Sequence, residues 1–457
     1  MSDRRVLVVG GGIAGLSAAV SLLDRTDLTV ELWEAGPRVG GKITTSPFAG
    51  LDHIDEGADA YLTRVPAAVA FAERLGVTDL TSPTEASAAV WHDRLHPIPG
   101  GIVLGMPAAI RPFATTSLLS WRGKARAAIE PVLPRRDHGD SLGALMRQRF
   151  GDEVHERLVD ALVGSIYATD TDRSSLAAVP QLAGLAERHR SLLLGGRAAR
   201  AAAPTASGPI FAAPTQGMAA LVGAAADHVR QRGGTIHTGR AATAIEPGDD
   251  GWVVDGERFG AVVIASPAAS TARLLDTASP DAARLLRAIE FADVIMVRLA
   301  VAGEAWPERL HGRSGYLVPK PDQRFVTAAS FGSQKWAHWR PADGTQILRT
   351  SLGRDGLPVR HLDDDAVITN SIDDLNRHLD LDLQPGHVSI TRWHDAFPQY
   401  RPRHHERVAA VEAALPPGLA IAGASYRGIG IPACIADGER AARIVKETTG
   451  TADGFLT

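Results

Sequence analysis

The sequence predicts an α/β fold organised around a parallel sheet of buried strands. Arg5–Val9 is a short, continuously apolar run rich in valine, and it leads into glycines and then into residues with helical periodicity. Leu28–Trp33 and Val262–Pro267 contain further apolar runs of strand length. Gly418–Ser425 is another, and it too is followed by a small-residue turn and a helix. Such runs are typical of strands that are covered on both faces.

Length and composition narrow the class of protein. A chain of 457 residues is too long for one compact core, so we expect two or three domains. The 48 basic and 52 acidic residues give a net charge of −4, which favours no nucleic-acid partner. Cys434 is the single cysteine, so no internal disulfide is expected and a reducing compartment fits.

The chain carries no apolar run of the roughly 18 residues that a membrane span needs. The apolar stretch at the N-terminus becomes glycine almost at once, so it does not resemble a signal peptide. We therefore expect a cytoplasmic protein, and a peripheral contact with a membrane stays open.

The turn after Arg5–Val9 has the G-x-G-x-x-G spacing of dinucleotide-binding proteins. The first glycine permits the tight turn, the second lets the backbone approach a pyrophosphate, and the third permits close packing of helix on strand. The helix then presents free N–H groups to phosphates. Glu34, 19 residues past Gly15, is placed to accept hydrogen bonds from ribose hydroxyls. A glycine-rich turn without a ligand is the alternative. The candidate contacts in the turn are Gly10, Gly11, Gly12, Ile13, Ala14 and Gly15.

Glu34–Lys42 resembles the E-A-x-x-R-x-G-G-[KR] run of the flavin amine oxidase superfamily. The resemblance implies FAD as the cofactor, wrapped by Glu34, Ala35, Arg38, Gly41 and Lys42. For Arg38 taken alone, a solvated charge in a loop is the alternative. Glu56–Ala60 resembles the turn that lies near the isoalloxazine ring in this superfamily, with Ala58 and Ala60 in place of the usual proline and serine. The implied contacts in that turn are Gly57, Ala58, Asp59 and Ala60.

The C-terminal part narrows the resemblance further. Gly423–Ile435 is similar to the ending of bacterial protoporphyrinogen and coproporphyrinogen III oxidases, with Ala433 where the pattern usually has Asp. Trp393 lies in a segment similar to the family's R-W-x-x-A-x-P-Q-Y, where the tryptophan lies against the flavin; core packing is the alternative. His237–Ile245 resembles the strand on the adenine side. The further contacts implied by these segments are Ala242, Trp393, Gly423, Ile429, Gly430 and Ile431.

The resemblance also implies how the chain is divided. We expect a discontinuous Rossmann-like FAD-binding domain of residues 1–80, 205–275 and 405–457. A helical insertion of residues 81–204, without strands, is expected to be of the membrane or substrate-entrance type. Residues 276–404 are expected to form a mixed-sheet substrate domain. Arg64, Lys320 and Arg349 are the candidate cations for substrate propionates, although most such charges are solvated. No metal-ligand spacing occurs among the 16 histidines, and His404–His405 is expected to be a solvated loop pair.

The implied reaction is the six-electron oxidation of coproporphyrinogen III to coproporphyrin III in haem biosynthesis, with oxygen consumed and hydrogen peroxide released. Because flavin N5 takes the hydride, we expect no catalytic triad and no indispensable protein base. The expected partners are the porphyrinogen and oxygen, with a hand-off to a ferrochelatase. A protoporphyrinogen IX oxidase is the near alternative. A flavin amine oxidase and a non-catalytic flavin-binding scaffold are more distant ones.

Overall fold

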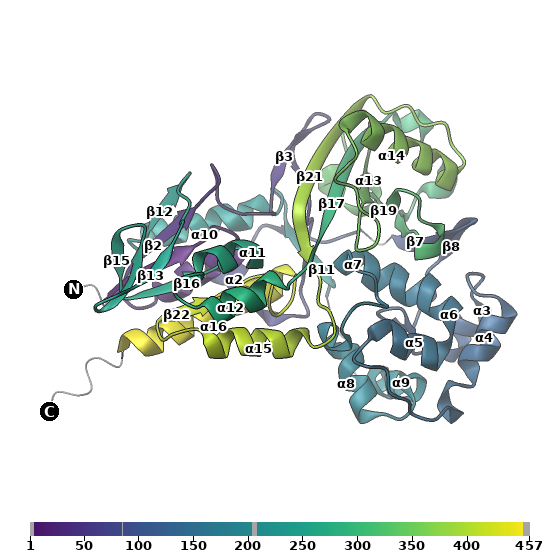
Figure 1. The fold of residues 1–457 in the computed structure, drawn as a ribbon. Coiled ribbons are helices and arrows are strands. Elements are labelled where there is room, and N and C mark those ends of the chain that lie inside the picture. The colour runs from purple at the N-terminus through teal and green to yellow at the C-terminus, as the bar shows by residue number, and fades with distance from the viewer. Residues whose placement is uncertain (1–3, 85, 203–207, 451–457) are drawn as a thin grey trace.

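The computed structural model describes residues 4–84, 86–202 and 208–450. Figure 1 shows one lobe that holds both ends of the chain and the parallel sheet, and a second lobe that holds a larger sheet and a group of helices. Five parallel strands form the first sheet, and they come from three distant parts of the sequence. In spatial order they are β12 (Thr235–Thr238), β2 (Thr29–Glu34), β1 (Arg5–Val9), β16 (Ala261–Ile264) and β22 (Leu419–Ile421).

Alternate residues of the parallel strands enter two separate cores, as the continuous apolar runs predict. Val6 and Val8 of β1 face the helices α1, α2, α10 and α16. Leu7 and Val9 face α11, α12, α15 and a small antiparallel sheet, β13–β15. These elements are α1 (Ile13–Leu22), α2 (Pro66–Arg74), α10 (Ala219–Gln231), α16 (Ile431–Gly450), α11 (Ala268–Leu274), α12 (Pro280–Arg287), α15 (His404–Ala414), β13 (Ile245–Gly248), β14 (Gly251–Val254) and β15 (Glu257–Phe259).

A seven-stranded sheet forms the upper part of the second lobe in Figure 1. Its strands pair antiparallel except β18 and β7, which are parallel. One face packs on α14 (Asp364–Leu379). In spatial order the strands are β21 (His387–Pro398), β17 (Phe291–Val301), β20 (Gln346–Leu352), β19 (Val326–Phe331), β18 (Arg313–Leu317), β7 (Ser87–His92) and β8 (Arg94–Pro97).

The helical insertion has its own core, built on residues such as Met146, Leu158 and Leu182. Its helices are α3 (Ile110–Thr115), α4 (Trp121–Ala128), α5 (Leu142–Phe150), α6 (Asp152–Val154), a π-helix (His155–Gly164), α7 (Ser165–Tyr167), α8 (Pro180–Arg188) and α9 (Leu192–Ala202). Within the described residues, no helix combines the length and the apolar character that crossing a membrane requires.

The expectation of a strand-free segment at 81–204 is wrong at its start. Residues 87–97 form β7 and β8 of the large sheet, and β9 (Ile102–Val103) pairs with β10 (Met106–Pro107). β7 is only six residues long, and Ala89 pairs with Tyr316 of β18, more than 200 residues later. A strand stabilised by so distant a partner leaves little signal in its local periodicity.

Short elements connect the two lobes. A hairpin and a three-stranded sheet lie beside the turn at Glu56–Ala60. The strands are β3 (Thr45–Phe48), β4 (Leu51–Asp55), β5 (Tyr61–Leu62), β11 (Phe211–Pro214) and β6 (Leu80–Thr81). The remaining helical elements are α13 (Gly332–Lys335) and 3₁₀ turns at Glu130–Val132, Leu176–Ala178, Gly303–Ala305, Glu308–Leu310, Lys320–Asp322 and Ala337–Trp339.

Candidate functional site

The candidate site is centred on the carboxyl edge of the parallel sheet, where ligands of such sheets bind. Gly10 follows β1 with a φ of +105°, and a Cβ there would lie 2.7 Å from the carbonyl oxygen of Ala265. A Cβ on Gly15 would overlap the carbonyl oxygen of Gly10. Gly12 differs from both, because nothing lies within 4 Å of its Cβ position. The turn is therefore closed where it packs on the sheet and open at Gly12, at the start of α1.

Glu34 is fixed at the end of β2 by the neighbouring backbone. Its two carboxylate oxygens accept hydrogen bonds from the N–H groups of Gly11 and Gly36, each at 2.7 Å. Each oxygen can accept a further bond, so the contact with ribose hydroxyls stays a prediction that this geometry permits. The side chain also joins the glycine turn to the loop that follows β2.

The loop at Arg38–Lys42 lies against the glycine turn. The N–H of Gly40 donates to the carbonyl of Gly11 at 2.7 Å, and the Cβ position of Gly41 lies 3.3 Å from the Cα of Gly12. Arg38 donates to the carbonyls of Ile43 at 3.2 Å and of Gly41 at 3.1 Å. The exposed guanidinium therefore holds its own loop in shape, and its contact with FAD stays a prediction.

Trp393 and Gly57 meet at a second wall of the site. The Cβ position of Gly57 lies 3.6 Å from Nε1 of Trp393 and 3.3 Å from the carbonyl oxygen of Lys42. The indole Nε1 is buried and has no hydrogen-bond partner among the described residues. A buried donor without a partner is costly, and it is the kind of group that a bound cofactor satisfies. Desolvation lowers the pKa of Lys42 beside this wall.

Asp59 lies in the turn at Glu56–Ala60, which also contains Gly57, and neighbouring side chains hold its carboxylate. Lys335 Nζ lies 2.8 Å from its carboxylate, Trp336 Nε1 lies 3.1 Å away and Arg349 lies 3.2 Å away. Burial alone would raise the pKa of Asp59, but the charges of Lys335 and Arg349 outweigh it and hold the pKa well below its ordinary value. The turn at Glu56–Ala60 is thus held by a buried ionic cluster.

The substrate role predicted for Arg349 is corrected by this cluster. Besides its ion pair with Asp59, the buried guanidinium donates to the carbonyls of Gly57 at 2.6 Å and of Asp55 at 3.3 Å. These contacts hold the guanidinium against the turn, where it supports the cofactor wall. Arg64 is exposed, and no ion pair of its side chain occurs among the described residues.

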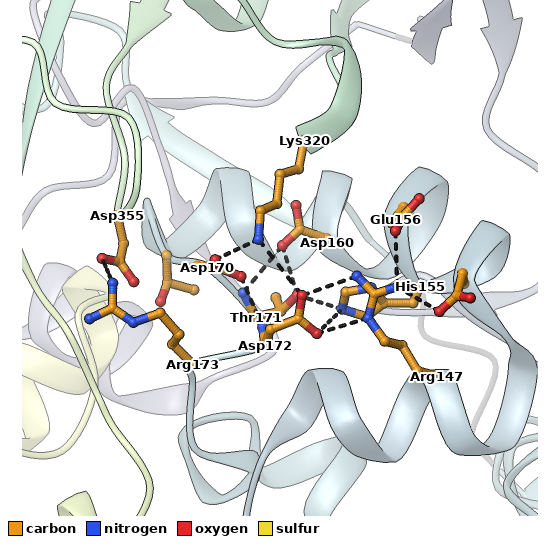
Figure 2. A network of polar contacts seen from close by, with 12 residues as sticks. Arg147, His155, Glu156, Asp160, Asp170, Thr171, Asp172, Arg173, Lys320 and Asp355 are labelled. Carbon is orange, nitrogen blue, oxygen red and sulfur yellow. Dashed lines mark hydrogen bonds and ion pairs between the residues drawn. The ribbon is translucent and has the colours of Figure 1, made fainter.

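Lys320 lies in an ionic network between the helical insertion and the large sheet (Figure 2). Its Nζ is 2.5 Å from Asp170 and 3.7 Å from Asp172. Asp172 in turn pairs with Arg147. Arg354, which follows β20 of the large sheet, donates hydrogen bonds of 2.8 Å to both carboxylate oxygens of the buried Asp160. The network therefore fastens the two parts of the second lobe to each other.

Tyr400 shapes the turn before α16. Its hydroxyl accepts from the N–H of Gly428 at 2.8 Å and donates to the carbonyl of Ala424 at 2.5 Å. The N–H of Gly423 donates to the buried Asp437 at 2.9 Å. The Cβ positions of Gly423 and Gly430 meet only single atoms, at 3.9 and 3.8 Å. The backbone here is firmly held but open on one side, beside the first turn of α16 where Ile431 begins the helix.

Some contributors were not foreseen. No local sequence pattern indicated Lys335 or Asp437. Tyr400 could have been found, because it is the last residue of the family segment that contains Trp393. The prediction that His404 is solvated is also wrong. The side chain is buried and stacks on Tyr400 with ring centres 4.0 Å apart, and desolvation lowers its pKa to about 4. It is not solvated, because it begins α15 directly beneath that tyrosine. Ala242 lies half-buried between β12 and β13, beside the core that contains Trp33.

The residues present fit an FAD. Open backbone at Gly12, Gly423 and Gly430 and the unpaired indole of Trp393 border one region, which the carboxylate of Glu34 also reaches. Within the described residues, no cluster of three His, Cys, Asp or Glu side chains suits a metal ion.

Comparison with known proteins agrees with this geometry. The model of the family described as flavin containing amine oxidoreductase matches residues 13–446. Coproporphyrinogen III oxidase of Bacillus subtilis (strain 168) is 33% identical over 96% of this chain and 98% of its own length. That of Mycobacterium tuberculosis (strain ATCC 25618 / H37Rv) is 34% identical over 98% of both.

Solved structures point the same way. The crystal structure of an Exiguobacterium sp. 255-15 protein that is named as a protoporphyrinogen oxidase has a TM-score of 0.85. It is 28% identical in sequence and covers 98% of this chain and 99% of its own length. Cyclohexylamine oxidase from Brevibacterium oxydans IH-35A shares the fold, with a TM-score of 0.66 at 17% identity over 97% of this chain and 99% of its own. The chain therefore belongs to the family of flavin-containing amine oxidoreductases, and it is an FAD-dependent oxidoreductase.

Proposed function

We propose that this enzyme oxidises coproporphyrinogen III to coproporphyrin III, passing the electrons to oxygen with release of hydrogen peroxide. The observation that carries the proposal is the end-to-end similarity to relatives named coproporphyrinogen III oxidase, which covers 96–98% of this chain. The similarity includes the C-terminal turn at Gly423–Gly430, where the structure holds open backbone beside a helix.

The protein's part in this reaction is to hold the cofactor and to shield its reacting face from water. When bound, FAD supplies the hydride acceptor that the oxidation of a CH₂ bridge needs. Gly12 and Gly423 let the backbone approach the cofactor, while the first N–H groups of α16 face it with the positive end of the helix dipole. Trp393 and Gly57 form a wall that keeps water from the reacting face. No side chain is assigned as a general base.

The substrate side is proposed to lie next to Trp393, between the helical insertion and the large sheet. A small cavity of about 30 Å³ there is lined by Ala168, Val294, Met296 and Phe397, whose apolar side chains suit the face of a pyrrole. Its volume is far below that of a tetrapyrrole, so we infer that the cavity widens when the substrate binds.

Lys320 is the candidate that remains best placed for a propionate. Exchanging the carboxylate of Asp170 for one from the substrate would keep the ammonium group paired, and Asp170 would keep the hydrogen bond that it accepts from the N–H of Asp172 at 3.1 Å. Lys320→Gln is expected to raise the KM for coproporphyrinogen III while the flavin absorbance stays unchanged. Arg64→Gln tests the remaining candidate in the same assay.

Turnover tests the proposal. Protein loaded with FAD is incubated aerobically with coproporphyrinogen III, and porphyrin fluorescence, oxygen uptake and peroxide are followed together. We expect three peroxide molecules for each porphyrin, as six electrons require. Protein that binds FAD but forms no porphyrin faster than the buffer would overturn the proposal in favour of a flavin-binding scaffold. Oxidation of primary amines instead would place it with the amine oxidases.

A cytoplasmic enzyme with a peripheral membrane contact is part of the proposal. The helical insertion exposes Ile110, Trp121 and Val132, and Arg122 and Lys124 follow the tryptophan. Apolar side chains next to cations favour an anionic lipid surface. Flotation with vesicles that contain phosphatidylglycerol tests the contact, and recovery only in the vesicle-free fraction would contradict it. Product hand-off to a ferrochelatase is tested by comparing the rates of iron insertion into the porphyrin with and without a trap for free porphyrin; a rate that the trap abolishes would contradict the hand-off.

A further inference from the structure

A cavity of about 370 Å³ lies inside the helical insertion, near α5, α8 and α9 at the lower right of Figure 1. This volume is in the range of sites that bind small organic molecules. None of the residues that line it belongs to the walls around Gly12, Trp393 or Gly423. It is therefore separate from the cofactor site.

The lining of this cavity changes from cationic to apolar. Arg135, Arg136 and Arg190 are exposed, whereas Leu145 and Leu192 are buried. Leu176, also buried, completes the apolar part. A ligand that matches both parts must carry a negative charge at one end and hydrocarbon at the other.

Among the described residues, Arg149 is the one arginine of this lining that has an ionic partner. Arg149 is satisfied, because the buried Glu130 and the carbonyls of the surrounding loops take its donors. Arg135 reaches only the backbone carbonyl of Glu187, at 3.4 Å. Among the described residues, no hydrogen bond or ion pair involves the side chains of Arg136 and Arg190.

Two carboxylates and two histidines, His138 and His189, complete the ionisable lining. Asp140 also lines the cavity, but it already accepts from the hydroxyl of Ser175 at 2.8 Å and from the N–H of Arg403 at 2.9 Å. Glu187 is exposed. With Arg149 paired to Glu130, three guanidinium groups face these two carboxylates. Nδ1 of His138 is buried and has no partner among the described residues.

We propose that this cavity binds an amphipathic carboxylate. Arg136, Arg190 and Nδ1 of His138 hold the carboxylate group, and Leu145 and Leu192 pack against the hydrocarbon part. Guanidinium groups bind carboxylates with charge-assisted hydrogen bonds, and the ligand would also satisfy the unpaired imidazole nitrogen. A simple phosphate ion would leave the apolar part facing water, and a neutral hydrocarbon would leave the arginines unpaired.

Calorimetric titration of the FAD-loaded protein with octanoate tests the proposal. Octanoate is expected to bind saturably, and 1-octanol, acetate and inorganic phosphate at least about tenfold more weakly, since each lacks one of the two matched parts. Equal binding of 1-octanol would overturn the role of the arginines. Equal binding of acetate or phosphate would overturn the role of the leucines, and no saturable binding of octanoate would overturn the site.

Variants assign the binding to this cavity. The double variant Arg136→Gln with Arg190→Gln is expected to weaken octanoate binding about tenfold or more, because two charge-assisted partners are lost. Ala183→Leu places a larger side chain in the lining and is expected to abolish binding. Arg188→Gln is the matched control, since Arg188 is an exposed arginine on α8 outside the lining.

Flavin absorbance and the thermal unfolding curve of every variant check that it is folded. If the arginine double variant or the filled variant binds octanoate as tightly as the wild type, the carboxylate is held elsewhere and the proposal is overturned.

Discussion

Tyr400→Phe removes one hydroxyl group from the site and keeps the aromatic ring. The ring keeps its stack on His404, while the hydroxyl that joins Gly428 to Ala424 is lost. Both groups lie in the turn that leads into α16. The substitution therefore removes two hydrogen bonds from the cofactor turn without opening a large cavity.

The magnitude follows from these two bonds. Each buried polar group left without a partner costs about 1–3 kcal/mol, and both groups here are part-buried, so we expect the free energy of unfolding to fall by about 2–4 kcal/mol, the lower part of the summed range. If about a third to a half of this energy holds the turn in its cofactor-binding shape, FAD affinity falls about tenfold. Urea unfolding measures the first quantity, and titration of the apoprotein with FAD measures the second.

Tyr316→Phe is the control. Its hydroxyl is also buried and lies 2.9 Å from Nδ1 of His378, but it belongs to β18, behind the large sheet. We expect it to lower stability without changing FAD affinity. The reasoning is refuted if Tyr400→Phe binds FAD as the wild type does, or if both variants lose affinity equally.

Three further predictions follow from named contacts. The Cβ that Gly12→Val adds meets no atom within 4 Å, so the apoprotein should unfold at the wild-type urea concentration while the purified protein lacks the flavin colour; normal FAD content would contradict this. Burial raises the pKa of Asp55 to about 6, so its contribution to stability is fully present below its unfolded pKa of about 4 and is lost as pH rises through about 6. Asp55→Asn should remove that loss of about 3 kcal/mol, measured by urea unfolding at pH values of about 4 and 7, and an unchanged pH dependence would count against it. Arg354→Met leaves the buried Asp160 without its ionic partner and should cost about 3–5 kcal/mol in the same assay, whereas a loss below about 1 kcal/mol would show that the pair is not what fastens the two parts of the second lobe.

The sequence predicted best those features that are set by local chemistry. Arg5–Val9 and Leu28–Trp33 are buried strands because every side chain of a doubly covered sheet can be apolar, and that leaves a continuous run. Gly10 and Gly15 follow from a turn in which a Cβ has no room. These requirements are satisfied within some thirty residues, so they are visible in a short stretch of sequence.

Features set by distant partners could not be predicted. Ser87–His92 is a strand only because Arg313–Leu317 lies beside it, and Arg349 is a structural cation only because it pairs with Asp59, which Lys335 also holds. His404 is likewise buried by Tyr400 and Tyr426, whose ring and carbonyl it contacts. For such residues the same side chain in the same local sequence can be solvated or buried, and only the tertiary contacts decide.

The ratio of kcat/KM for coproporphyrinogen III to that for protoporphyrinogen IX tests the central claim most directly. Both substrates are oxidised aerobically by one preparation of the FAD-loaded enzyme, and porphyrin fluorescence gives the initial rates. We predict a ratio well above one, because the relatives that match this chain over nearly its full length are named coproporphyrinogen III oxidase. A ratio below one would contradict it and make the enzyme a protoporphyrinogen oxidase with the same cofactor site.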